Sequence, residues 1–124
     1  MIDFQNGTFV KLSQSDPDQY NTEISPILVD GEQILLTFKG VRDSVLFTNK
    51  RMIAVNVQGL TGKKRDYSSL PYAKIQAFSI ETAGMLDLDA ELELWFSGLG
   101  KVKLEFKGKT DIRMIGRLIG DHML

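Results

Sequence analysis

The sequence has 124 residues, which suits one domain that buries about two-thirds of its unfolded surface and folds without metal or disulfide support. Its residues are 43% hydrophobic and 25% charged with a formal net charge of −1, so the molecule as a whole has no electrostatic preference for nucleic acid or an anionic membrane. Cysteine is absent, which excludes disulfides, thiolate chemistry and cysteine-ligated metals.

The start of the chain indicates where the protein resides. Residues 1–5 lack the basic start and the apolar stretch of a signal peptide, and no apolar run approaches the ~20 residues of a membrane-spanning helix. We therefore expect a cytoplasmic protein.

The first thirty residues differ in pattern from the rest. Ser15-Asp16-Pro17 is typical of a helix start, because proline costs least in a first turn. Apolar residues at helical spacing follow, and Pro26 limits the length of the helix. We expect residues 1–30 to form an N-terminal segment, with a short helix or two turns, that packs on a domain formed by residues 31–124.

The remainder of the chain is dominated by short β-rich runs separated by turn residues. Their even spacing is typical of a sandwich or a barrel. The sequence predicts about seven strands, over residues 33–39, 44–48, 51–57, 64–69, 74–81, 91–96 and 101–107.

The clearest alternation occurs in the last two predicted strands. A three-residue loop over residues 98–100 predicts the pairs Phe96–Val102, Leu94–Leu104 and Leu92–Phe106. All six apolar side chains then lie on one face, and the charged residues lie with Trp95 on the other.

The chain ends in a predicted amphipathic helix. Thr110 is expected as its N-cap, and Asp111 favours the positive end of the helix dipole. Ile112, Ile115 and Ile119 then form one apolar stripe, which could plug an open end of a barrel or cover a sheet edge.

Residues 39–53, Lys-Gly-Val-Arg-Asp-Ser-Val-Leu-Phe-Thr-Asn-Lys-Arg-Met-Ile, carry a strand–turn–strand signature. The segment resembles the bacterial pleckstrin-homology (PH-like) domain family. The resemblance implies a mainly β (α+β) fold: a PH-like barrel of two nearly orthogonal antiparallel sheets, capped by a C-terminal helix. It also implies homo-oligomers, including ring-like ones. The resemblance to eukaryotic PH domains is one of architecture, because Asp43 and Ser44 stand where their phosphoinositide motif needs a second arginine.

Catalytic residues are not evident. His122 is the only histidine and falls in the last turn of the predicted helix, where a solvated role is expected. Asp87 and Asp89 could bind a cation through oxygen ligands, but the pattern favours a solvated loop without calcium-loop spacing. We expect no enzyme activity, no metal and no cofactor.

The basic residues fall into two groups around the predicted turns. In a barrel these turns could share one rim, which could hold a phosphate, an anionic membrane surface or an acidic partner segment. The alternative is a solvated edge that prevents sheet-to-sheet aggregation. Nucleic acid is disfavoured, because few aromatics lie among these residues. The residues of this possible anion site are Lys39, Arg42, Lys50, Arg51, Lys63, Lys64 and Arg65.

Three residues are candidates for an interface. Trp95 either contacts another molecule or is covered by the N-terminal segment with Phe4, Phe9 and Ile24. Gly116 and Gly120, four residues apart, could admit a helix of another subunit or lie close to the domain's own sheet.

Two functions are therefore kept open. The first is a non-enzymatic scaffold module that self-associates into a homo-oligomer and mediates interaction with an unidentified protein. The second is an adaptor that binds a membrane surface or a phosphate-type ligand through the basic rim.

Overall fold

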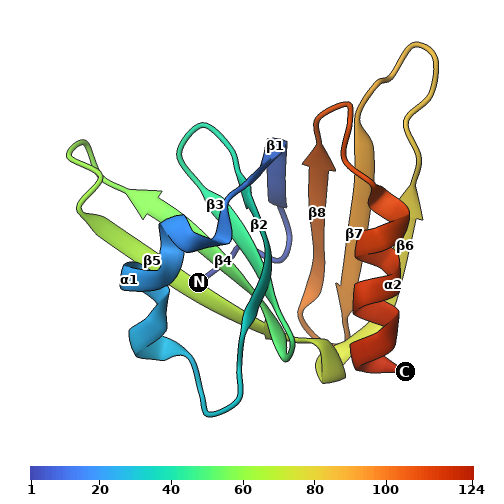
Figure 1. The fold of residues 1–124 in the computed structure, drawn as a ribbon. Coiled ribbons are helices and arrows are strands. Elements are labelled where there is room, and N and C mark those ends of the chain that lie inside the picture. Colours follow the sequence, from blue (N-terminus) through green and yellow to red (C-terminus); the bar gives the residue numbers. More distant parts are fainter.

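Eight strands form one curled sheet in the computed structural model, which describes residues 1–124 (Figure 1). The strand order is β5-β4-β3-β2-β1-β8-β7-β6. The strands are β1 (Gly7–Ser15), β2 (Ile34–Lys39), β3 (Ser44–Thr48), β4 (Arg51–Gln58), β5 (Lys64–Pro71), β6 (Ile75–Glu81), β7 (Ala90–Phe96) and β8 (Gly100–Phe106). The helices are α1 (Asn21–Ile24) and α2 (Ile112–Met123), with 3₁₀ turns η1 (Pro17–Tyr20), η2 (Ser25–Ile27) and η3 (Tyr72–Lys74).

The predicted mainly β class, the seven strands and the C-terminal helix are confirmed. The eighth strand, β1, was not predicted. It pairs antiparallel with β2 through Ser13–Ser15 and parallel with β8 through Gly7–Leu12, so it joins two antiparallel groups of strands. Within the pairing with β8 the register shifts between Phe9 and Leu12, and Lys11 in that interval adopts a left-handed φ of 53°.

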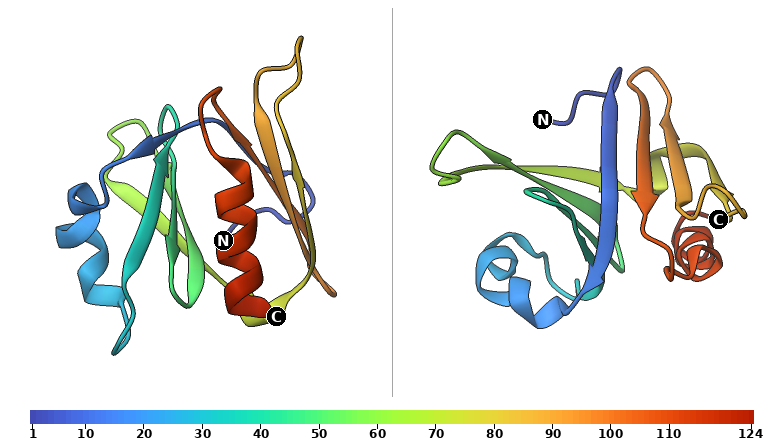
Figure 2. Two further views of the ribbon diagram at one scale, coloured as in Figure 1. Left: turned by 45° about the vertical axis from the view of Figure 1, so that its right-hand side comes forward. Right: turned by 90° about the horizontal axis from the view of Figure 1, so that it is seen from above.

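The predicted helical segment near the N-terminus is confirmed as η1, α1 and η2. Asp16 caps η1 by accepting a hydrogen bond from the backbone N–H of Asp18 at 3.0 Å. The segment lies on the outer face of β3 and β4, as Figure 2 shows. A small core forms there from Tyr20, Ile24, Leu46, Ile53 and Val55, so β4 is buried on both of its faces.

The main core lies inside the curled sheet. Phe38 of β2 stacks edge-on against Phe47 and Phe106, with ring centroids 5.9 and 4.9 Å apart. α2 contributes Ile112, Ile115 and Ile119 to the same core. The helix therefore closes one side of the half-barrel, as its apolar stripe predicts.

The predicted register of the last hairpin is wrong by two residues. Phe96 pairs with Gly100 and Leu94 with Val102, so the loop consists of residues 97–99. Gly98 and Gly100 both have positive φ, at 79° and 132°, which makes the turn at this position possible. Because side chains alternate with a period of two, the predicted faces remain correct.

The predicted N-cap of the last helix is also wrong by one residue. Asp111, not Thr110, caps α2, because its carboxylate accepts a hydrogen bond from the backbone N–H of Met114 at 3.2 Å. The hydroxyl of Thr110 instead donates to the carbonyl oxygen of Lys107 at 3.0 Å. No helix of the structure combines the length and the apolar character needed to cross a membrane.

Candidate functional site

A hollow of about 540 Å³ opens between the loop joining β2 to β3 and the loop joining β4 to β5. Its lining includes Lys39, Val41, Arg42, Leu60 and Arg65. The two loops meet because β2 to β5 pair antiparallel in chain order, which places these turns at one rim of the sheet. Arg42 fixes the rim by donating from Nη2 to the carbonyl oxygen of Gly59 at 2.6 Å.

The cations of this hollow are not equally free. Arg65 forms an ion pair with Glu23 at 2.9 Å, and Glu23 also accepts a hydrogen bond from the hydroxyl of Tyr67 at 2.7 Å. Burial, together with the Glu23 carboxylate, raises the pKa of Tyr67. Lys39 and Arg42 have no acidic partner, so their charges are available to a ligand.

Lys63 and Lys64 are exposed at the start of β5, near Arg65. Lys50 and Arg51 lie elsewhere, in the turn and at the strand start at the opposite end of β3 and β4. The structure thus brings together only part of the predicted basic set.

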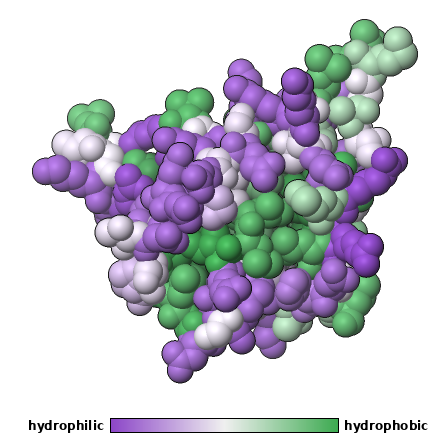
Figure 3. Space-filling view, in the orientation of Figure 1, coloured by the Kyte–Doolittle hydropathy of each residue, from purple (hydrophilic) through white to green (hydrophobic).

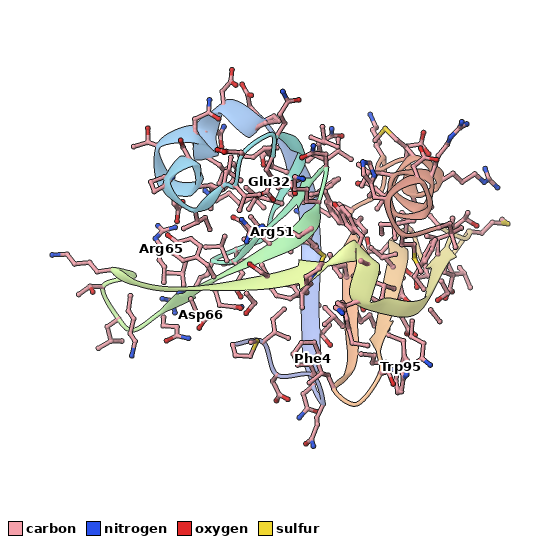
Figure 4. All side chains as sticks on the ribbon, turned by 90° about the horizontal axis from the view of Figure 1, so that it is seen from below. Phe4, Glu32, Arg51, Arg65, Asp66 and Trp95 are labelled. Atoms are coloured by element: carbon pink, nitrogen blue, oxygen red, sulfur yellow. The ribbon has the colours of Figure 1, made fainter.

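Arg51 is engaged in a buried network, as Figure 4 shows. Its Nε and Nη2 donate to the two carboxylate oxygens of Glu32 at 2.8 and 2.9 Å, while Nη1 reaches Ser69. Burial opposes ionisation of Glu32, but hydrogen bonds from Arg51, Thr48 and the Val29 backbone hold its pKa below the ordinary value. This network anchors the chain between η2 and β2 to the sheet and leaves no free cation for a ligand.

Two exposed apolar side chains, at the tips of the β2–β3 and β4–β5 loops, lie beside Lys39 and Arg42 in the hollow. Val41 is 89% exposed and Leu60 is fully exposed, and Figure 3 shows apolar atoms at both loop tips at the upper left. Sequence reasoning missed these residues, although an apolar side chain within a turn flanked by Gly40 or Gly59 is a signal that could have found them.

Trp95 lies on the outer face of β7 and is 48% exposed. The N-terminal segment does not cover it: Phe4 packs edge-on against Phe96 at 5.7 Å, Phe9 belongs to the main core and Ile24 to the small core. Figure 4 shows Trp95 directed away from the body, at some distance from Phe4.

The charges around Trp95 neutralise one another across the strands. Lys103 lies 3.4 Å from Glu91, and Lys101 lies 3.9 Å from Glu93. The Glu91 carboxylate raises the pKa of Lys103.

The remaining candidates lie on α2 and in the loop between β6 and β7. Gly116 is buried against Ile80 of β6, where an added Cβ would lie 3.1 Å from Cδ1 of Ile80, and Gly120 is half-buried. The exposed ring of His122 lies with Nδ1 2.7 Å from the carbonyl oxygen of Leu118. Asp87 and Asp89 lie in the loop, and the chain has no cluster of three acidic, histidine or cysteine side chains that could hold a metal ion.

A curled, mostly antiparallel sheet with a C-terminal helix packed against it defines a pleckstrin-homology-like fold. The family model of the bacterial PH domain matches residues 3–123. The chain therefore belongs to the bacterial PH domain family, as residues 39–53 predict.

Relatives and solved structures agree with this membership. The chain is 46% identical over 99 residues to the uncharacterized protein YjqA of Bacillus subtilis, covering 78% of this chain and 79% of that protein. It is 34% identical over 101 residues to the uncharacterized protein YozO of the same organism, covering 82% and 87%. A protein with a pleckstrin-homology domain from Shewanella loihica is similar in structure with a TM-score of 0.81 and 42% identity, covering 92% of this chain and 98% of that chain. A pleckstrin homology domain from Shewanella amazonensis gives a TM-score of 0.69 and 45% identity, covering 90% and 91%.

Proposed function

We propose that this chain is a non-enzymatic scaffold module that binds protein and associates with copies of itself. The observation that carries the proposal is the exposed indole of Trp95 on the outer face of β7 and β8. Tryptophan is enriched at the centres of protein interfaces, where its burial contributes strongly to affinity. The neighbouring lysines and glutamates already pair with one another, so covering this face buries no isolated charge.

Two further observations support a binding role without catalysis. The chain belongs to a family defined by a PH-like fold, and its only histidine is exposed at the end of α2. We retain the cytoplasm as the expected location, because the absence of cysteine gives no sign of an oxidising compartment.

Light scattering coupled to size exclusion, across a concentration series, tests self-association. We expect a mass several times 13.9 kDa for the wild type and a smaller mass for Trp95→Asp. Val29→Asp is the matched control, because Val29 is 57% exposed and lies away from β7, in the connection between η2 and β2. Circular dichroism shows whether each variant is folded. A wild type that remains a monomer at every concentration would exclude self-association.

The hollow supports a second candidate, an adaptor for an anionic membrane surface or a phosphate-type ligand. Lys39 and Arg42 have no acidic partner, and Val41 and Leu60 project beside them. An apolar tip that enters the lipid interface next to cations that contact its headgroups is a common form of surface binding.

Sedimentation with vesicles tests this candidate. Retention on vesicles that contain phosphatidylserine, decreasing with salt and absent from phosphatidylcholine vesicles, is the expected result. Lys39→Glu and Arg42→Glu should weaken retention, while Lys50→Glu at the other end of β3 should not. No retention at low salt would exclude the membrane-surface adaptor.

A further inference from the structure

The loop that joins β6 to β7, residues 82–89, carries an apolar tip. Met85 is 96% exposed, Leu86 is fully exposed and Leu88 is 63% exposed. The tip has a defined turn, because the backbone N–H of Gly84 donates to the carbonyl oxygen of Asp87 at 2.6 Å. Figure 3 shows these apolar atoms at the upper right, beyond the rest of the surface.

The loop belongs to an acidic part of the chain. Residues 81–89 contain three acidic residues, Glu81, Asp87 and Asp89, and no lysine or arginine, and none of the three forms an ion pair. Asp87 and Asp89 flank the apolar tip. The loop therefore carries unpaired acidic groups, whereas the hollow carries the unpaired cations Lys39 and Arg42.

The loop and the hollow lie at opposite edges of the sheet. The hollow is near edge strand β5, and the loop leaves edge strand β6 (Figures 1 and 2). A single copy therefore cannot bring the two together, but two copies can.

The two surfaces match in both apolar and charged character. The loop offers exposed leucine and methionine side chains next to two carboxylates. The hollow offers exposed Val41 and Leu60 next to Lys39 and Arg42, which lack acidic partners. Each surface alone leaves apolar area in water, and docking removes both areas from water while pairing the charges.

We propose that the loop of residues 82–89 in one copy docks into the hollow between the β2–β3 and β4–β5 loops of a second copy. Met85 and Leu86 pack against Val41 and Leu60, and Asp87 approaches Lys39. The contact rests on the self-association proposed above and is additional to Trp95, which lies at the other end of the β6–β7 hairpin. Because it joins unlike surfaces, it repeats from copy to copy, head to tail.

Cysteine cross-linking tests the contact directly, since the chain contains no cysteine of its own. Leu86→Cys is mixed with a tagged Leu60→Cys protein under mild oxidation, and the mixed disulfide is separated by size. Both positions are fully exposed, so the substitutions leave the core intact. We expect the mixed product to exceed the statistical share severalfold and to fall at high salt. The matched control is Leu99→Cys with the same tagged partner, because Leu99 is an exposed leucine in a different loop.

Charge reversal provides a second measurement. Asp87→Lys added to the Leu86→Cys chain should reduce the mixed product, and Lys39→Glu added to the Leu60→Cys partner should restore it. A mixed product at the statistical share overturns this contact. If the wild-type mass still exceeds 13.9 kDa, self-association stands and only the contact fails; if the wild type is also a monomer, both fail. A statistical product together with retention on phosphatidylserine vesicles would assign the hollow to a membrane surface and would also overturn the contact.

Discussion

Arg51 holds Glu32 with two parallel hydrogen bonds, at 2.8 Å from Nε and 2.9 Å from Nη2, and the Glu32 side chain is fully buried. Such a bidentate pair is stronger and more directional than a single ion pair. It connects Glu32, two residues before β2, with the start of β4, and Arg51 Nη2 also donates to the carbonyl oxygen of Ile27 at 2.7 Å.

Removing the arginine should destabilise the domain. We expect Arg51→Met to lower the free energy of unfolding by about 3 kcal/mol, because it leaves a buried carboxylate without its cation. Lys50→Met is the control, since Lys50 is exposed and unpaired, and it should change the free energy by less than about 0.5 kcal/mol. Urea denaturation followed by circular dichroism measures both. Equal effects of the two substitutions would show that the network is not stabilising.

The same carboxylate predicts a pH dependence. The pKa of Glu32 is lowered in the folded state. Its contribution to the free energy of unfolding is therefore fully present above the pKa of the unfolded chain, about 4.3, and is lost as the pH falls through the folded-state pKa. Glu32→Gln should therefore be less stable than the wild type at pH 7, and the difference should shrink below about pH 4.3. Denaturation of the two proteins from pH 7 to pH 3 checks this. A difference that stays constant over that range would contradict it.

The left-handed backbone of Lys11 predicts a stabilising substitution. A φ of 53° is unfavourable for a residue with a Cβ, so Lys11→Gly should raise the free energy of unfolding by about 0.5–1 kcal/mol. Val10→Gly, one residue earlier in the same strand and without a positive φ, should lower it by a similar amount. Thermal denaturation gives both values. Two changes of the same sign would mean that strain at Lys11 is not the cause.

Gly98 and Gly100 of the last hairpin allow the cost of an unfavourable backbone conformation to be compared with the cost of steric crowding. Both have positive φ, but a Cβ on Gly100 would lie 2.5 Å from the carbonyl oxygen of Phe4, whereas one on Gly98 would meet nothing within 4 Å. We expect Gly98→Ala to cost about 1 kcal/mol and Gly100→Ala about 3 kcal/mol. The larger loss should include the 3.1 Å hydrogen bond from the Lys101 N–H to Phe4. Chemical denaturation distinguishes the two, and equal costs would contradict the close approach.

The strands that alternate strictly could be predicted from the sequence, but β1 could not. In β1 only Phe9 and Leu12 are buried, and the irregularity at Lys11 separates them by three residues instead of two. A period-two search therefore fails at the one strand that changes partners. The offset in the last hairpin has a similar origin, because a shift of two residues conserves the buried face and leaves the apolar pattern unchanged.

The candidate site was predictable in part. The turns that carry Lys39, Arg42 and Arg65 follow from the strand pattern, and the structure brings them to one hollow. Lys50 and Arg51 could not belong to it, because an extended strand of five residues spans about 17 Å and separates its two ends. The ion pair of Arg51 with Glu32 joins residues from different turns, which the sequence pattern does not specify.

The partner change of β1 has a consequence for the order in which the chain assembles. Phe9 of β1 pairs with Leu104 of β8, near the other end of the chain, so the centre of the sheet cannot be completed until β8 has formed. During synthesis β2 to β5 can already pair with one another, but the apolar side chains of β1 lack their contacts with β8 until the end of the chain has been made. Closing such a long loop slows folding. We expect β1 to dock late, so that substitutions that weaken this strand mainly accelerate unfolding.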